Sequence, residues 1–433
     1  MELLEELVFH HDFRFRACDL VLYNPHMSSP YKTLSTAELL RKRVLLRAGF
    51  DVPVENGVVT DTTRIESLVP TMKYILDHGA MLIIMAHQGR PKDAPDPTFS
   101  QKPLVPVLEK LLGTTVHFAE DCVGEKAESA VKQAKMGDIV LLENLRFHPE
   151  EKKNDPAFAK ALASLGDMYV NDAFTNCHRS HASMVGVPTL LPSYMGLQLE
   201  QEVDHLLRVM KSPMHPLTLI IGGAKLETKV PIIRNFLPLA DHILVGGAVG
   251  NTFVAAQGIP VGKSKYDAEG VSQAKELLEE SMKEGSATLG VPTDAFVATS
   301  PEDGANGKNM SFDAAGETLG GDGGEGSFFD IGTKTAEAYA LIIKNSKMII
   351  WNGPVGLSEN EAFSKGSKTL CHAVQEATKN GAVSIIGGGD TIDFHNRYDI
   401  PLDAYTFVSM GGGAMLEFLS GKEFASLNAL KDA

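Results

Sequence analysis

Four glycine-rich turns in the second half of the sequence each follow a short apolar run of the kind that forms a strand. They are Gly222-Gly223-Ala224-Lys225, Gly246-Gly247-Ala248, Gly387-Gly388-Gly389-Asp390 and Gly411-Gly412-Gly413. A strand that ends in glycines lets bare backbone N–H groups approach phosphate oxygens, and a helix that follows adds the positive end of its dipole. These turns therefore predict a phosphate-binding site.

Charged side chains accompany the glycines. Lys225 and Lys229 are four residues apart at what we predict to be the first turn of a helix, which would direct both ammonium groups toward a bound triphosphate. Asp390 is placed either to hold Mg²⁺ or to cap its helix. Trp351-Asn352-Gly353-Pro354 ends another strand, and a simple tight turn is the alternative interpretation there.

Cationic side chains follow the strand-like runs of the first half. They are Arg47, Arg64, His87, Arg90, Arg146, His178, Arg179 and His181. Guanidinium groups bind phosphate and carboxylate in a bidentate manner, so their convergence predicts an anion pocket. The alternative is that each arginine pairs with a nearby Asp or Glu, but their joint placement at successive strand ends favours the pocket.

Two nucleotide-binding motifs are absent from the sequence. The segment from Gly258 to Ser264 resembles a P-loop but has three residues between its glycines where that motif needs four, so we interpret it as a surface turn. No glycine cluster spells G-x-G-x-x-G with an acidic residue about 20 positions later, which leaves dinucleotide binding unsupported.

Composition narrows the class of protein. The chain has 433 residues, of which 43% are hydrophobic, so two domains are expected. A formal net charge of -15 argues against nucleic acid or anionic membrane as a partner. Cys18, Cys122, Cys177 and Cys371 lie far apart, which indicates neither a zinc site nor a disulfide framework. With no apolar run near about 20 residues and an acidic start, we expect a soluble, intracellular protein.

Apolar runs alternate with segments of helical periodicity, which predicts an α/β fold with parallel sheets. The runs are 44–46, 81–85, 139–142, 168–170, 217–221, 243–245, 348–351, 383–386 and 405–409. The expected helices are 64–78, 102–112, 155–165, 273–284, 335–344 and 363–378. A helix over 198–210 is expected to connect two domains, and 300–326 to form a surface loop.

From about Leu34 onward the chain resembles the phosphoglycerate kinase family, with the motifs in that family's order. The matches are Thr60-Asp61-Thr62-Thr63-Arg64-Ile65, His87-Gln88-Gly89-Arg90-Pro91-Lys92, Leu142-Glu143-Asn144-Leu145-Arg146-Phe147, Asn171-Asp172-Ala173-Phe174, His178-Arg179, Gly222-Gly223-Ala224-Lys225, Trp351-Asn352-Gly353-Pro354, Gly387-Gly388-Gly389-Asp390-Thr391 and Gly411-Gly412-Gly413-Ala414. The resemblance implies two doubly wound, Rossmann-like parallel-sheet domains that face each other across a cleft and are joined by a helix. Residues 1–197 would bind phosphoglycerate, with 414–433 packing back on them, and 198–413 would bind the nucleotide.

The implied reaction is reversible phosphoryl transfer from 1,3-bisphosphoglycerate to Mg-ADP, which gives 3-phosphoglycerate and ATP in glycolysis. By resemblance, the phosphoglycerate site comprises Gly49, Asp51, Arg64, His87, Arg90, Arg146 and Arg179. The nucleotide site comprises Gly223, Lys225, Lys229, Gly247, Asn352, Pro354, Glu359, Gly388, Gly389, Asp390 and Thr391, with Asp390 holding Mg²⁺. The catalytic groups would be Arg64, Lys225, Gly389 and Gly412. A cytoplasmic monomer without nucleic-acid or membrane partners is expected.

The chain departs from the family pattern at several ligand-binding positions. Where the family reads Arg-Val-Asp-Phe-Asn-Val-Pro, this chain reads Arg47-Ala48-Gly49-Phe50-Asp51-Val52-Pro53, so an unpaired Asp51 is expected to disfavour the substrate carboxylate. The other departures are Gln88 for Leu, Thr175 for Gly, Thr228 for Asp, Thr333 for Pro, Met410 for Thr, and Phe328-Phe329 for a Gly-Leu pair that lines the adenine site. They motivate a second hypothesis, a catalytically impaired or altered-substrate paralogue that acts as a nucleotide-binding or interaction protein.

Overall fold

The computed structural model describes residues 30–92, 95–312 and 326–431. The acidic start of the chain and Cys18 lie outside these residues. Among the helices that are described, none combines the length and the apolar character needed to cross a bilayer.

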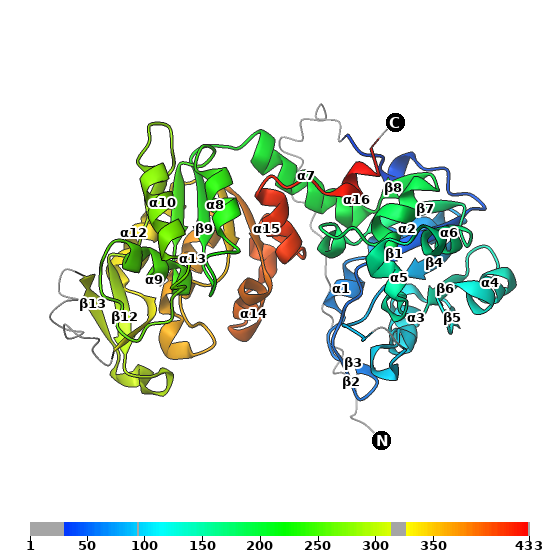
Figure 1. Ribbon diagram of the computed structural model, residues 1–433, viewed down its shortest axis with the longest axis horizontal. Coiled ribbons are helices and arrows are strands. Elements are labelled where there is room, and N and C mark those ends of the chain that lie inside the picture. The colour runs from blue at the N-terminus through cyan, green and yellow to red at the C-terminus, as the bar shows by residue number, and fades with distance from the viewer. Residues whose placement is uncertain (1–29, 93–94, 313–325, 432–433) are drawn as a thin grey trace, which may run out of the picture. The chain divides into compact units, whose positions relative to one another are not determined.

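Six parallel strands form the first sheet, in the order β5-β6-β4-β1-β7-β8 (Figure 1). Their bounds are β1 (Arg43–Ala48), β4 (Met81–Met85), β5 (Val116–Ala119), β6 (Ile139–Leu142), β7 (Met168–Asp172) and β8 (Ser193–Met195). Successive residues of a strand belong to different hydrophobic clusters: Leu45 packs in one, and Val44 and Leu46 pack in another. Both faces of the sheet are therefore buried, which explains the continuous apolar runs in the sequence.

Helices cover this first sheet. They are α2 (Val69–Asp77), α3 (Val105–Leu112), α4 (Gly124–Gln133), α5 (Pro149–Lys153) and α6 (Pro156–Ala163). The single helix expected over 64–78 is split into α1 (Thr63–Glu66) and α2, because Pro70 lies in the first turn of α2 and cannot donate the backbone hydrogen bond that a continuous helix requires.

A second sheet of six parallel strands has the order β11-β10-β9-β15-β16-β17. Its strands are β9 (Leu217–Ile221), β10 (His242–Val245), β11 (Thr288–Gly290), β15 (Met348–Asn352), β16 (Val383–Gly387) and β17 (Phe407–Ser409). Its helices include α8 (Val230–Phe236), α9 (Gly247–Ala256), α10 (Val271–Ser281), α12 (Thr333–Lys344), α13 (Lys365–Lys379), α14 (Gly389–Arg397) and α15 (Gly413–Leu419). The predicted class, two parallel-sheet α/β domains, is confirmed.

The surface loop expected over 300–326 is partly wrong. Residues Pro301–Asn306 form a 3-10 helix, η8, and Lys308–Ser311 form β13. With β12 (Asp294–Ala298) and β14 (Ser327–Ile331), β13 makes a small antiparallel sheet in the order β13-β12-β14. The remainder of the expected loop, 313–325, lies outside the described residues. A two-stranded hairpin of β2 (Val54–Glu55) and β3 (Val58–Val59) is the other antiparallel element described.

Helix α7 (Leu197–Lys211) follows the last strand of the first sheet and precedes the first strand of the second. Its first turn is fixed by Asp172 at the end of β7, whose Oδ1 accepts a hydrogen bond from Leu199 N at 2.7 Å. Near the C-terminus, α16 (Ala425–Asn428) contacts the first half of the chain, since Ser426 Oγ donates to the carbonyl of Cys177 at 2.7 Å.

Asp172 makes stability depend on pH. Burial raises its pKa to about 7, against the hydrogen bonds from Thr71 and Leu199. The folded protein therefore holds the proton more tightly than the unfolded chain, so stability present below about pH 4 is lost as the pH rises to about 7, by at most about 4 kcal/mol. We predict that Asp172→Asn flattens this decline in urea unfolding followed by circular dichroism.

The exposed residue Asp77 provides the control, because Asp77→Asn should keep the decline of the wild type. An unchanged pH profile for Asp172→Asn would show that burial of Asp172 carries no such cost.

Candidate active site

Three of the four glycine turns of the second sheet line one cavity of about 370 Å³ at the carboxyl ends of its strands. Its lining residues are Gly222, Gly223, Ala224, Lys225, Thr228, Lys229, Asn352, Gly353, Gly388, Gly389, Asp390, Thr391, Gly412, Gly413 and Leu416. Most of the predicted nucleotide-binding residues are among them. Gly247, Pro354 and Glu359 are not, and Glu359 is exposed elsewhere.

Close backbone approach explains the glycine at position 222. A Cβ atom there would lie 2.0 Å from the carbonyl oxygen of Pro354, well inside contact distance. Gly388 is required for another reason, because its φ of +103° is one that L side chains rarely adopt, and a Cβ would meet the amide of Asn352 at 2.6 Å. These turns bring bare backbone to the cavity wall.

Lys225 and Lys229 do not share the first turn of a helix, so that prediction is wrong. Helix α8 begins at Val230, with Pro231 in its first turn, and both lysines precede it. Lys225 is exposed, whereas Lys229 is buried and donates to Asn352 Oδ1. Burial lowers the pKa of Lys229 to about 8, although the charge of Asp390 acts in the opposite direction. The two ammonium groups thus reach the same cavity from very different surroundings.

Asp390 lies at the start of α14 but does not cap it. The N-cap residue is Gly388, and no side-chain cap hydrogen bond is formed among the described residues. The carboxylate is exposed and lines the cavity, so it remains available to a ligand.

The turn at 351–354 is more than a simple connection. Asn352 Nδ2 donates to the carbonyl of Gly387 at 2.8 Å, and Gly353 N donates to Thr391 Oγ1 at 2.8 Å. These bonds join the end of β15 to the end of β16 and to α14. They hold Asn352 where it accepts from Lys229.

A chain of buried polar groups ends at Asp51 in the first half. Ser183 Oγ donates to Glu151 at 2.6 Å and accepts from Arg47 Nε at 3.0 Å. Arg47 Nη2 lies 3.0 Å from His87 Nδ1. Because a guanidinium only donates, we assign the proton of His87 to Nε2, which lies 3.6 Å from Asp51 Oδ2. Burial lowers the pKa of His87 to about 3, so the ring is neutral.

The expectation that Asp51 is unpaired is wrong. Its Oδ1 accepts from Gly89 N at 2.8 Å, its Oδ2 faces His87, and Arg64 donates to its carbonyl oxygen. Burial alone would raise the pKa of Asp51, but the bonds from His87 and Gly89 together with the charge of Arg64 lower it below its ordinary value. The carboxylate is therefore stable as an anion without a substrate.

Arg146 and Arg179 stand in the same cationic group. Arg146 is 4% exposed and donates to the carbonyl of Gly89 at 2.7 Å, while its Nε has no partner in the described structure. Burial, together with the charges of Arg179 and Arg47, lowers the pKa of Arg146 to about 10. Burial and the same arginines lower the pKa of His181 to about 3. Uncompensated cations that crowd one another in this way favour an anion as their missing partner.

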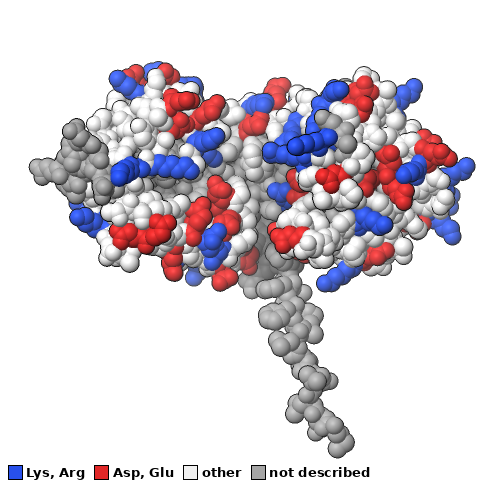
Figure 2. Space-filling view, turned by 60° about the horizontal axis from the view of Figure 1, so that its bottom comes forward, with Lys and Arg blue, Asp and Glu red and all other residues white. Residues whose placement is uncertain are grey.

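The alternative in which each arginine pairs with an acid is not observed here. Within the described residues, none of Arg47, Arg64, Arg90, Arg146 and Arg179 forms an ion pair within 4.0 Å, in contrast to the surface pair Arg43–Asp167 at 2.7 Å. Arg90 is exposed and Arg64 is half-buried. Over the face shown in Figure 2, basic and acidic side chains are interspersed.

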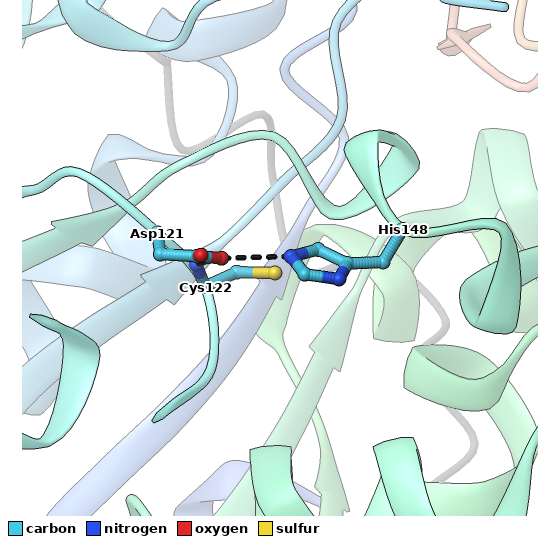
Figure 3. A group of neighbouring side chains, drawn as sticks. All are labelled: Asp121, Cys122 and His148. Atoms are coloured by element: carbon cyan, nitrogen blue, oxygen red, sulfur yellow. Dashed lines mark hydrogen bonds and ion pairs between the residues drawn. The ribbon is translucent and has the colours of Figure 1, made fainter. Parts of the chain in front are cut away.

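Asp121, Cys122 and His148 form a cluster near the ends of β5 and β6 (Figure 3). Their possible ligand atoms lie within 4.8 Å of one another, as in some metal sites. However, Asp121 Oδ1 already binds His148 Nε2 and Cys122 N, each at 2.7 Å, and burial raises the pKa of the thiol well above its usual value. We interpret the cluster as a bridge that fixes the segment between Arg146 and Glu151.

Phe328, one of the departures from the family pattern, is buried. Its ring is buried against Phe312, with ring centroids 5.2 Å apart, while half-buried Phe329 stacks on Phe363 at 4.6 Å. Sequence reasoning did not assign six further residues of the cavity lining to the predicted nucleotide site: Gly222, Ala224, Thr228, Gly353, Gly412 and Gly413. It also missed Leu416, whose apolar side chain gives no signal.

Two parallel-sheet domains, one with a glycine-lined cavity that carries two lysines, define an α/β enzyme that transfers phosphate groups. The family model for phosphoglycerate kinase matches residues 34–422. Curated relatives named phosphoglycerate kinase include one from Moorella thermoacetica, 43% identical over 92% of this chain and 99% of its own length. Another, from Akkermansia muciniphila, is 42% identical over 90% of this chain and 95% of its own length.

Solved structures agree with the sequence relatives. The phosphoglycerate kinase of Coxiella burnetii superimposes with a TM-score of 0.83 at 34% identity, over 93% of this chain and 99% of that one. That of Pyrococcus horikoshii gives 0.77 at 31% identity, over 92% and 98%. The chain belongs to the phosphoglycerate kinase family.

Gly222 supplies a test of the cavity geometry. We predict that Gly222→Ala lowers the melting temperature by several degrees, because its Cβ would overlap the Pro354 carbonyl and overpacking costs about 1–3 kcal/mol. Gly413→Ala is the control, since nothing lies within 4 Å of its Cβ position. Equal melting temperatures, measured by differential scanning fluorimetry, would contradict the close approach.

Proposed function

We propose that this kinase catalyses reversible phosphoryl transfer between 1,3-bisphosphoglycerate and Mg-ADP. The observation that carries the proposal is the cavity where Lys225, Lys229, Asp390 and three glycine turns converge. Its backbone N–H groups and ammonium groups suit a polyphosphate. Asn352 and Thr391 shape the same wall. Pro354, Gly247 and Glu359 lie outside it, and we assign them to the nucleotide only by the resemblance to the family.

The cationic group of the first half would hold the phosphoglycerate. His87, Arg146 and Arg179 supply positive or hydrogen-bonding groups, and Arg90 adds an exposed guanidinium. The support is electrostatic. Arg146 is almost fully buried, has an unused Nε–H and lacks an acidic partner among the described residues, so a phosphate or carboxylate would complete its bonding.

Mg²⁺ fits the site at Asp390. This exposed carboxylate lines the cavity and has no helix-capping role, and Mg²⁺ in kinases is commonly held by one or two carboxylates together with substrate phosphates. When bound, the ion would neutralise charge on the nucleotide phosphates.

In the proposed transfer, residues 1–197 and 198–413 act as separate substrate-binding domains whose closure surrounds the moving phosphoryl group with Arg64, Lys225 and the N–H groups of Gly389 and Gly412. Phosphoryl transfer requires little covalent help from the protein, so positioning and electrostatic stabilisation carry the catalysis. Closure would also exclude water that would hydrolyse the acyl phosphate. The proposal includes a cytoplasmic monomer.

The impaired paralogue finds no support. It was motivated by Gly49, Asp51, Phe328 and Met410, but Asp51 accepts a hydrogen bond from Gly89 N and faces His87, and Phe328 is packed in the core. We therefore expect the wild-type protein to be fully active in a coupled assay of ATP formation from 1,3-bisphosphoglycerate. Raised turnover on reverting Gly49→Asp together with Asp51→Asn would restore the impaired-paralogue hypothesis.

Lys225 should contribute to the transition state. We predict that Lys225→Met lowers kcat by about 100-fold or more, as expected for loss of a group that stabilises developing charge. The matched control is Lys275→Met, an exposed lysine on α10, which should leave kcat unchanged. Similar kcat values for the two variants would remove Lys225 from the proposed mechanism.

Asp390 should determine the dependence on magnesium. We predict that Asp390→Asn raises the half-saturating Mg²⁺ concentration in the coupled assay about tenfold or more, because a neutral amide binds a hard cation weakly. Asp393→Asn, three residues along the same helix and bonded to Arg397 at 2.9 Å, is the control. An unchanged magnesium requirement in Asp390→Asn would place the ion elsewhere.

A further inference from the structure

Two of the departures from the family pattern touch each other. A Cβ atom built on Gly49 would lie 3.2 Å from Thr175 Oγ1, and its next neighbour is the backbone of Ala173 at 3.7 Å. Where the family has Asp at 49 and Gly at 175, this chain has the smaller residue at 49 and the larger at 175. The Thr175 hydroxyl therefore stands beside the space in which a side chain at position 49 would begin.

Two other departures, Gln88 and Asp51, are bonded to each other's segment of the chain. Gln88, which replaces a Leu, holds the backbone of Val52 at both ends of its amide: Oε1 accepts from Val52 N at 3.3 Å, and Nε2 donates to the Val52 carbonyl. The adjacent Gly89 N–H binds Asp51. Gln88 thus fastens the segment that carries Asp51 to the turn that carries His87.

Thr175 retains a hydrogen to donate. Its Oγ1 accepts from Asn176 Nδ2 at 2.9 Å, and the residue is half-buried. Together with Gly49 and Arg64 it lines a second cavity of about 20 Å³. A volume of this size holds one water molecule or one hydroxyl group.

We propose that Thr175 is a specificity-determining residue that takes over the role of the missing side chain at 49 by donating a hydrogen bond to the 2-hydroxyl of the phosphoglycerate, while Asp51 accepts from that hydroxyl. The inference rests on the proposed function. In the family pattern an acceptor stands at 49 and an amide donor at 51, and here the donor and the acceptor have exchanged places.

The exchange is chemically consistent, because a hydroxyl group is both a donor and an acceptor and can satisfy either arrangement. It also explains how an anion is tolerated at 51. Each pattern contains one carboxylate. Here its charge is balanced by the guanidinium of Arg64, by the His87 ring that faces it and by the hydrogen bond from Gly89 N.

A double-mutant cycle tests the steric half of the proposal. We expect Gly49→Asp alone to raise the KM for 3-phosphoglycerate about tenfold, because its side chain must displace Thr175, while Gly49→Asp with Thr175→Gly returns it to near the wild-type value. The KM for ATP should stay constant throughout. Effects on KM that simply multiply would overturn the coupling.

A second measurement tests the hydrogen bond. Thr175→Val should raise the KM for 3-phosphoglycerate about fivefold, as for loss of one hydrogen bond. It should leave unchanged the KM for 3-phosphonooxypropanoate, which lacks the 2-hydroxyl. Thr175→Ser should restore the wild-type KM. The control is Thr189→Val, since the exposed Thr189 hydroxyl donates to the carbonyl of Gly186.

The two proposals fail in different ways. A wild-type protein that turns over neither 3-phosphoglycerate nor its 2-deoxy analogue, and binds neither in calorimetry, would overturn both the proposed function and the inference. A wild-type protein that is active, but in which Thr175→Val affects both compounds equally, would overturn the inference alone.

Discussion

The close approach of two backbone segments, at Gly222 after β9 and at Pro354 after β15, determines the geometry of the phosphate cavity. Gly223 N donates to the carbonyl of Pro354 at 3.2 Å, and Gly222 N donates to the carbonyl of Asn352 at 2.9 Å. No side chain fits between the segments. The backbone contact explains why the turn at Gly222 and Gly223 is rich in glycine independently of any ligand.

The two halves of the chain present different groups to an anion. In the second half, bare backbone and the ammonium of Lys229 are brought to a cavity wall, and burial makes that ammonium easier to deprotonate. In the first half, Arg47 and Arg146 are buried against each other's charge, and the buried Glu151 balances only part of it. A cation held without an equal counter-charge is costly, and this cost is offset when a phosphate or carboxylate arrives.

The sequence predicted the central strands well, because strands buried on both faces are continuous apolar runs. It did not predict β5 or β8, edge strands that place polar residues such as His117 and Ser193 among apolar ones. The antiparallel sheet of β12, β13 and β14 was missed for a similar reason, since β13 is short and largely exposed. Local periodicity carries no information on strands whose partners are distant in sequence.

For the site, residue types were predictable and their surroundings were not. The glycine turns and the arginines were recognised because their positions at strand ends are a local property. The neutrality of His87 and the pairing of Asp51 depend on Arg47 and Gly89, which reach them through the fold. Gly49 and Thr175 are 126 positions apart, so their compensation is visible only where the structure brings the two residues into contact.

Helix α7 is bonded both to the segment that precedes the glycine turn Gly411–Gly413 and to the end of the first sheet. Its residue Glu202 accepts from Met410 N at 2.7 Å, directly before Gly411–Gly413, while Asp172 fixes the first turn of the same helix from β7. Burial raises the pKa of both acids to about 7. Both bonds are made by residues in the N-terminal half of α7, Leu199 and Glu202, so a displacement of that half must break one of them or move the segment bonded to it. Through these two bonds the N-terminal half of α7 connects the segment that precedes Gly411–Gly413 to the end of β7.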